Sequence, residues 1–256
     1  MSSAGNDIVA LKAIDKQRTN HSRFYSKILS DAEQSLYCRQ QGAEMPFENF
    51  VWLLWSIKES VYKYLKRTTP GLVFSPTKII VRNIDLPGSP ASSLYNSSAD
   101  PCCSSPAAKS EGAQWESRDA GSREELYKGV AFFESRSFHF QSKVHPEYIA
   151  TVVNGTESFE NIWWGIKRIG HSDYESQSAS VRTFALNRLH FILPGDKNGL
   201  RIEKNRLGSP VVLRGEEEMD IPVSLAHHDH FVAYSFYLSE EGRSLYLSKE
   251  GRSVIS

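Results

Sequence analysis

The stretch NFVWLLWSIKESVYKYLKR, residues 49–67, has the pattern of one long amphipathic helix, and the rest of the fold is predicted outward from it. At about 100° per residue its apolar side chains share one broad arc; these are Leu54, Trp55, Ile57, Val61, Tyr62 and Leu65. Glu59, Lys63 and Lys66 fall with Trp52 in a narrow stripe outside that arc. Since Glu59 and Lys63 are four residues apart, one interpretation is an ion pair on a solvated helix face. The alternative is that these charges serve a site.

The composition predicts a globular protein with no general attraction for polyanions. The chain has 256 residues, of which 40% are hydrophobic and 23% charged, typical of a soluble domain that buries a core. Its formal net charge is zero, so neither nucleic acid nor an anionic membrane is an expected partner, and an anionic ligand must be held by local clusters. No apolar run is long enough to cross a membrane, no signal peptide is visible, and the three cysteines form no CxxC pair. These features predict a cytoplasmic protein.

Hydrophobic periodicity and turn residues predict a mixed order of strands and helices. A capping box of Ser30 and Glu33 supports the first predicted helix. The segment from about 86 to 125 is rich in Ser, Ala, Pro and Gly, and is predicted to be a mobile insertion, since it cannot bury enough apolar surface to become ordered. The predicted helices are 23–41, 49–67 and 178–193, and the predicted strands are 5–14, 78–85, within 129–154, 201–205, 209–215 and within 223–238.

The two halves of the chain have a similar order of elements. The segment 142–145 followed by 148–151 parallels 224–227 followed by 231–234, and each pair lies downstream of a helix. This repetition predicts two related α+β units, residues 1–154 and 155–256, with a ligand cleft between them. The alternative is two unrelated stretches of ordinary α/β pattern.

An acidic residue in the first strand changes the interpretation of the helix. Asp7 lies in the apolar strand GNDIV, and a strand Asp combined with Glu59 and helix lysines is the set that Mg²⁺ with a polyphosphate requires. The run His227, His228, Asp229, His230 could suggest zinc, but neighbouring side chains on a turn diverge and no fourth ligand is placed by spacing. A turn with one functional histidine is therefore the favoured interpretation.

In the segments that contain Asp7, Glu59 and His227, the chain resembles the 4'-phosphopantetheinyl transferase superfamily. GNDIVAL followed by WSIKESVYK is similar to the family signatures G-x-D and W-x-x-K-E-[SA]-x-x-K. GSPVV and VSLAHHDHFVAYSF look like its G-K-P strand and its S-x-S-H element. The resemblance implies the α+β fold of that family, here as a fused pseudo-dimer that carries its metal motifs in the first half, so that one chain builds a complete site without a partner subunit.

The resemblance also implies an activity. The family transfers 4'-phosphopantetheine from coenzyme A to a serine of an apo acyl or peptidyl carrier protein, in a Mg²⁺-dependent reaction that releases adenosine 3',5'-bisphosphate. By this resemblance Asp7 and Glu59 bind the metal, Glu59 accepts the serine proton, and Lys63 contacts the phosphate under attack. On the nucleotide, His227 matches the contact to the 3'-phosphate, and Gly208 and Pro210 match the turn beside the adenine.

Three positions depart from the family pattern. Val9 replaces a second acid, which implies that water completes the metal shell, while Ser209 replaces the lysine of G-K-P. In S-x-S-H, Ser224 is retained but Ala226 replaces the second serine. The nearby cations Lys12, Lys66 and Arg182 are candidates to restore coenzyme A binding. The departures leave one alternative open, a catalytically silent carrier-binding relative. A Mg²⁺-dependent phosphohydrolase is a further alternative, which the lack of another acidic cluster makes the least favoured.

Overall fold

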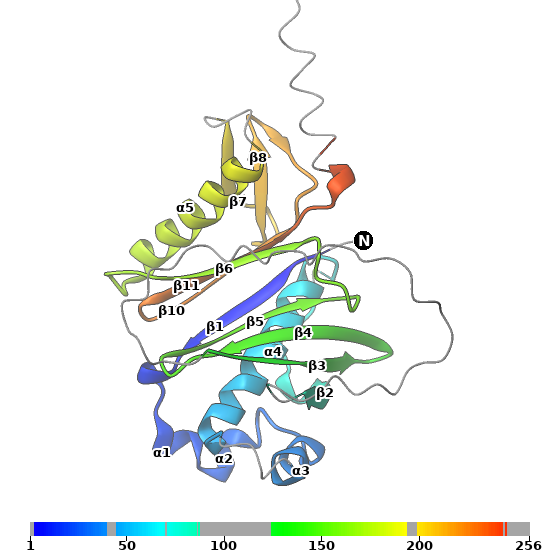
Figure 1. The fold of residues 1–256 in the computed structure, drawn as a ribbon, viewed down its shortest axis with the longest axis vertical. Coiled ribbons are helices and arrows are strands. Elements are labelled where there is room, and N and C mark those ends of the chain that lie inside the picture. The colour runs from blue at the N-terminus through cyan, green and yellow to red at the C-terminus, as the bar shows by residue number, and fades with distance from the viewer. Residues whose placement is uncertain are drawn as a thin grey trace, which may run out of the picture.

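The computed structural model of the protein describes residues 3–39, 45–69, 71–85, 87, 124–193, 199–242 and 244. Apart from residues 87, 124 and 125, the predicted insertion therefore lies outside the described residues. None of the helices in the described part of the chain is both long enough and apolar enough to cross a membrane. The described chain is a mixed α+β fold with three antiparallel sheets (Figure 1).

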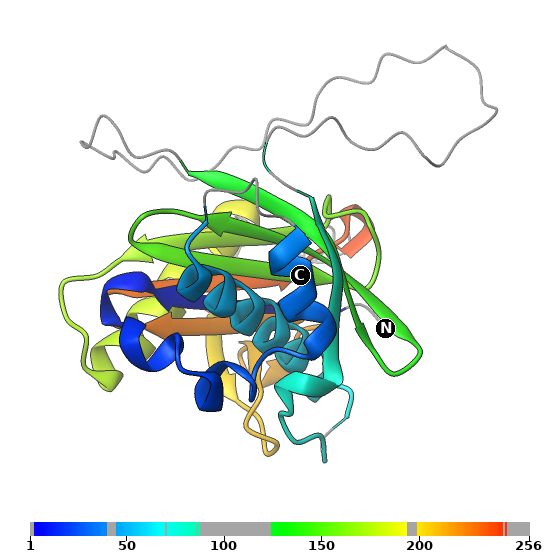
Figure 2. The same ribbon diagram turned by 90° about the horizontal axis from the view of Figure 1, so that it is seen from below.

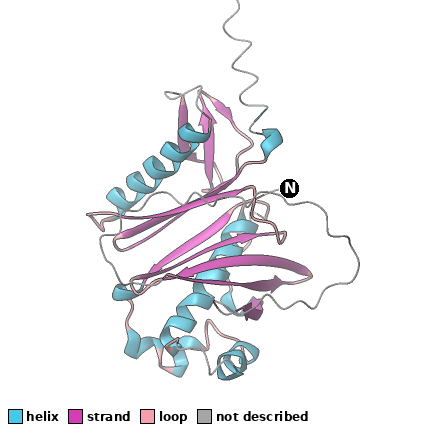
Figure 3. Ribbon diagram, in the orientation of Figure 1, coloured by secondary structure: helices cyan, strands magenta, loops and turns pink. Residues whose placement is uncertain are grey.

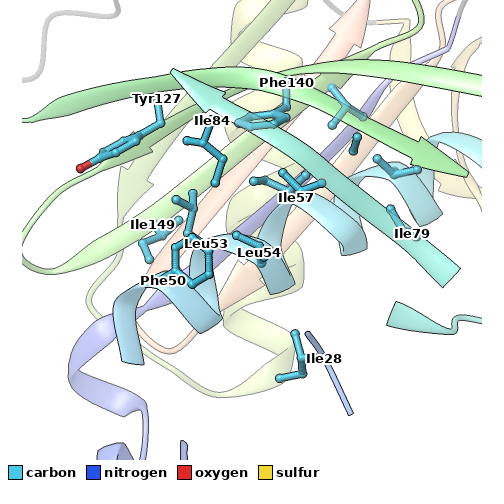
Figure 4. Packing of buried hydrophobic residues seen from close by; sticks show 14 of the residues in the cluster. Ile28, Phe50, Leu53, Leu54, Ile57, Ile79, Ile84, Tyr127, Phe140 and Ile149 are labelled. Carbon is cyan, nitrogen blue, oxygen red and sulfur yellow. The ribbon is translucent and has the colours of Figure 1, made fainter. Parts of the chain in front are cut away.

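The largest sheet has the strand order β1-β5-β4-β3-β2, and helix α4 (Phe47–Lys66) packs against it. Apolar residues of α4 such as Leu53, Leu54 and Ile57 lie against Phe140 and Ile149 of the sheet (Figure 4). This helix extends two residues beyond the predicted start and ends one residue before the predicted end. The five strands are β1 (Gly5–Ala10), β2 (Ile79–Asp85), β3 (Glu125–Phe133), β4 (Arg136–Val144) and β5 (Tyr148–Asn154).

Short helical segments connect β1 to α4. The predicted strand 5–14 ends at Ala10 and continues as the 3₁₀ turn η1 (Leu11–Ala13). The predicted helix 23–41 is divided at the capping box, where the Ser30 N–H donates to Glu33 Oε2 at 2.8 Å and the Glu33 N–H donates to Ser30 Oγ at 3.4 Å. The helices here are α1 (Lys16–Thr19), α2 (Ser22–Tyr25) and α3 (Asp31–Arg39), and a second 3₁₀ turn, η2 (Pro76–Lys78), precedes β2.

The remainder of the chain forms two small sheets and helix α5 (Tyr174–Ile192), as Figure 3 shows. This helix begins four residues before its predicted start, because Asp173 Oδ1 caps it by accepting the Ser176 N–H at 2.9 Å. The sheets have the orders β10-β11-β6 and β7-β8-β9, and β6 and β9 were not predicted. The strands are β6 (Ile162–Arg168), β7 (Leu200–Lys204), β8 (Pro210–Arg214), β9 (Glu217–Glu218), β10 (Val223–His228) and β11 (Phe231–Tyr237).

The order of elements is similar in the two parts of the chain. In each part the first strand pairs with the last, the last pairs with its hairpin partner, and a long helix follows the first strand. The segments that suggested a repeat lie at equivalent places, the β4–β5 hairpin and the β10–β11 hairpin. The second part differs in that its strands are divided between two sheets.

Strand β1 joins the two parts, because its two faces have different neighbours. Ile8 and Ala10 pack against Ala226, Phe231 and Ala233 of the β10–β11 hairpin. In both views the hairpin lies beside β1 (Figure 1, Figure 2). The opposite face of β1 is turned to α4, and this alternation directs Asp7 toward the helix.

Candidate active site

The charged residues of α4 have two different roles. Lys58 is completely buried, and its ammonium group donates to Glu33 Oε2 at 2.7 Å and to the Ile28 carbonyl at 2.6 Å. The second Glu33 oxygen accepts the Val81 N–H at 2.8 Å. Lys58 therefore ties α4 to α3 and β2. Glu59, about 100° further around the helix, is turned instead toward β1.

Asp7, Glu59 and Lys63 form one cluster between β1 and α4. Lys63 Nζ lies 2.9 Å from Asp7 Oδ1 and 3.8 Å from Glu59 Oε1. The side chains of Glu59 and Lys63 are each 24% exposed and that of Asp7 is 10% exposed. The predicted i,i+4 ion pair of Glu59 and Lys63 is therefore present, but its helix face is only partly exposed and Asp7 of β1 joins the pair.

Gly5 allows this close approach of β1 and α4. A Cβ atom at position 5 would lie 2.2 Å from the Ser60 carbonyl oxygen and 2.8 Å from Tyr64 Cβ, where no side chain can fit. The glycine of the G-x-D signature thus brings the strand near enough to the helix for the Asp7 carboxylate to reach Lys63.

The Asp7 and Glu59 carboxylates fit a divalent cation. Asp7 Oδ2 is buried and has no hydrogen-bond partner among the described residues, so this oxygen is available as a ligand. Burial raises the pKa of Glu59; Lys63 opposes this effect, and the negative charge of Asp7 adds to it. A cation would relieve the repulsion between the two acids.

Within the described residues, no three His, Cys, Asp or Glu side chains are placed to hold a metal together. A Mg²⁺ ion here would therefore take two protein carboxylates and complete its shell with ligand oxygens or water. The zinc alternative gains no support, since His228 Nδ1 accepts the Ala10 N–H at 2.9 Å and Asp229 occupies the hairpin turn with φ +50°.

A cleft of about 250 Å³ opens beside this cluster, between α4 and the elements of the second part of the chain. None of the described residues that line it is acidic, whereas its basic side chains come from four elements. These are Lys63, Lys66 and Arg67 at the end of α4, Arg182 on α5, Lys204 on β7 and His227 on β10. Such a concentration of positive charge suits an anionic ligand.

The positive charges of the cleft affect the pKa of His227. Burial lowers the pKa of His227, and Lys63, His228, Lys204 and Arg182 lower it further. The Tyr174 ring meets the imidazole edge-on, with 5.5 Å between the centroids. Burial and the surrounding positive charges thus favour the neutral form of this histidine.

Known families provide an independent comparison. Residues 3–115 match the 4'-phosphopantetheinyl transferase superfamily, ACPS. This match confirms the predicted resemblance, and its span includes β1 and α4, hence Asp7, Glu59 and Lys63. No curated protein and no solved structure matches the chain.

The structure brings most of the predicted 4'-phosphopantetheinyl transferase residues to one place. The cleft is lined by Lys63, Lys66, Arg182, Gly208, Pro210, Ser224 and His227. Lys12 is not among the lining residues; its side chain is 73% exposed, and its ammonium group pairs with Glu147 at 2.6 Å. Ser209 lines the cleft, whereas Ala226 packs in the apolar contact between β1 and the β10–β11 hairpin.

The sequence prediction missed two further cations of the cleft. Arg67 Nη1 donates to the carbonyl oxygens of Pro210 and Val223, each at 2.8 Å, and so joins the end of α4 to β8 and β10. Its position four residues after Lys63 placed it on the functional helix stripe, and this signal could have revealed it. Lys204 lines the cleft from β7. Its place there depends on the pairing of Lys204 with Pro210 in the β7–β8 hairpin, a tertiary contact that no sequence motif marks.

Proposed function

We propose that the protein transfers the 4'-phosphopantetheine group of coenzyme A to a serine of an apo acyl or peptidyl carrier protein, and releases adenosine 3',5'-bisphosphate. The observation that carries this proposal is the convergence of Asp7, Glu59 and Lys63 beside a cationic cleft. The family match of the segment that contains all three residues supports it.

Asp7 and Glu59 are the residues that would hold Mg²⁺, which when bound neutralises charge on the diphosphate. Attack of an alcohol on a pyrophosphate phosphorus depends mainly on positioning and charge neutralisation. Lys63, which is held by both carboxylates, would contact the phosphate under attack. Glu59, which lies beside Lys63, would accept the serine proton.

The other residues of the cleft suit the nucleotide. His227 and Arg182 would bind phosphate, while the turn of Gly208 and Pro210 would lie beside the adenine. Lys66 and Ser224 extend the same wall. Lys12 is left out of the proposed site, because it does not line the cleft.

We also infer that residues 1–154 and 155–256 are two fused copies of one α+β unit. The repeated order of elements and the equivalent β4–β5 and β10–β11 hairpins support this inference. Under this arrangement Asp7 and Glu59 come from the first copy and His227 from the second, so one chain builds the whole site.

The direct test is incubation of the full chain with an apo carrier protein, coenzyme A and Mg²⁺, followed by intact mass measurement of the carrier. A carrier protein incubated with the wild-type chain should gain the mass of one phosphopantetheine group. Asp7→Asn and Glu59→Gln should each slow transfer by at least about 100-fold, as expected for lost electrostatic stabilisation of the reacting group. Glu48→Gln removes a carboxylate elsewhere on α4, where Glu48 pairs with Lys16, and should leave transfer unchanged.

The outcomes separate the alternatives. Near-normal transfer by Asp7→Asn would show that the metal assignment is wrong. Binding of coenzyme A by wild type, with no mass gain on acyl or peptidyl carriers, would favour a silent carrier-binding relative, the alternative that the replacements at Ser209 and Ala226 support. Cleavage of coenzyme A without a protein acceptor would indicate a phosphohydrolase.

A further inference from the structure

We propose that Lys204 is a phosphate-binding residue of the cleft and that, together with Arg182 and His227, it recognises the 3'-phosphate of the nucleotide. This inference rests on the proposed function, because it assumes that the anion in the cleft is coenzyme A or its nucleotide product. It starts from a cation that belongs to none of the motifs found in the sequence.

A rigid hairpin presents Lys204 at the cleft. Lys204 is the last residue of β7 and is paired with Pro210, the first residue of β8. In the turn between them, Asn205 Oδ1 accepts the N–H groups of Leu207 and Ser209, each at 3.0 Å. Gly208 has φ +78°, a conformation that favours glycine. The backbone beneath Lys204 is therefore fixed before any ligand binds.

The ammonium group of Lys204 makes no ion pair or hydrogen bond with another described residue. Arg201 on the same strand shows the contrast, because it pairs with Glu203 at 2.7 Å and Glu216 at 2.9 Å. Among the described lining residues of the cleft no carboxylate is present to neutralise Lys204. Its charge is thus left for a ligand.

Two further basic residues that line the cleft with Lys204 are Arg182 on α5 and His227 on β10. Arg182 is held by the carbonyl and hydroxyl oxygens of Ser178, both of which accept from its Nη1. Lys204, Arg182 and His227 line the same cleft, and the positive charges of Lys204 and Arg182 both contribute to lowering the pKa of His227. Like charges that converge in this way repel one another, and an anion with two charges relieves the repulsion.

The contacts of Lys204 distinguish it from Lys63 at the reaction centre. Lys63 is held between Asp7 and Glu59, so the end of the cleft beside α4 suits the diphosphate. Lys204 comes instead from the hairpin that carries Ser209, the position at which a lysine is lost. Its side chain supplies a cation to the same wall of the cleft from the neighbouring strand. Lys204 pairs with neither carboxylate of the acidic cluster, so under the proposed function its charge would serve the 3'-phosphomonoester and not the phosphate under attack.

The test compares two ligands by isothermal titration calorimetry, adenosine 3',5'-bisphosphate and adenosine 5'-monophosphate, which lacks the 3'-phosphate. Lys204→Gln should weaken binding of the bisphosphate by about tenfold, the typical effect of one lost charged hydrogen bond. Its affinity for the monophosphate should stay within about twofold of wild type. Lys204→Arg, which keeps the charge, should bind the bisphosphate nearly as well as wild type. Arg206→Gln is the matched control, because Arg206 lies in the same turn but does not line the cleft.

Unchanged bisphosphate binding by Lys204→Gln, or an equal loss with both ligands, would overturn the assignment. So would a loss of the same size in Arg206→Gln, since the effect would then be one of net charge. The carrier assay separates this result from the proposed function. If wild type transfers phosphopantetheine while Lys204→Gln binds normally, only the inference about Lys204 fails. If wild type binds the bisphosphate in a Lys204-dependent way but modifies no carrier, the proposed function fails alone.

Discussion

The buried Lys58–Glu33 pair allows a quantitative prediction for Lys58→Met. Both side chains are fully buried, and methionine keeps the apolar length of lysine while it removes the ammonium group. Glu33 would retain its contacts to Ser30 and Val81 but lose its counter-charge, and the Ile28 carbonyl would lose a donor at 2.6 Å. Removal of one partner from a buried ion pair costs about 3–5 kcal/mol. We therefore expect the unfolding free energy to fall by about 3 kcal/mol.

Urea unfolding followed by tryptophan fluorescence measures this change, since Trp52 and Trp55 lie on the same helix. Lys16→Met is the matched control. This substitution breaks the ion pair of Lys16 with Glu48, in which the Lys16 side chain is 64% exposed. It should change the free energy of unfolding by less than about 1 kcal/mol. The double variant Glu33→Gln, Lys58→Met should lose less than the sum of the two single variants, because the buried charge and its counter-charge leave together. A loss in Lys58→Met no larger than that in Lys16→Met would refute the view that this pair anchors α4.

Two further predictions concern β1 and the cleft. Gly5→Ala should destabilise the protein by about 1–3 kcal/mol and reduce transfer, because its methyl group would push β1 away from Ser60 and Asp7 away from Lys63; unchanged melting and activity would contradict this reading. In the folded protein the pKa of His227 is lowered from 6.5, so the unfolded chain binds a proton at this histidine at a higher pH than the folded chain does. Protonation of His227 therefore destabilises the fold as the pH falls below 6.5. His227→Gln should reduce that acid destabilisation in denaturation curves, and adding adenosine 3',5'-bisphosphate should raise the His227 pKa in an NMR titration; a ligand-independent titration would argue against an anion at this position.

Local sequence patterns predicted the elements that carry the chemistry. Helix α4 and the Ser30–Glu33 capping box follow from periodicity and from short-range hydrogen bonding, which act within a few residues of each other. The resemblance in G-x-D and in the helix motif selected Asp7, Glu59 and Lys63, and the structure places them together. Beginnings and ends of elements were less well predicted. The Asp173 cap lengthened α5, and Ser30 divided the predicted helix 23–41.

Tertiary contacts decided the role of each charged residue. Lys58 follows Leu54 by four residues and so lies on the apolar arc of α4, a position that indicates burial, but nothing in the sequence identifies Glu33 as its partner. Lys12 is near Asp7 along the chain, yet the turn after β1 directs it to Glu147. Arg67 and Lys204 reach the cleft only because the end of α4 meets the β7–β8 hairpin.

The sequence by itself therefore determined the α4 helix and selected Asp7, Glu59 and Lys63 as one candidate set. The helix follows from spacing along one element, and the candidate set follows from residue chemistry and from the resemblance in two motifs. Only the tertiary structure decided which cations share the cleft and which are neutralised elsewhere. The physical reason is that electrostatic interaction depends on distance through space, and distant segments approach one another only after the apolar faces of β1, α4 and the β10–β11 hairpin have packed together.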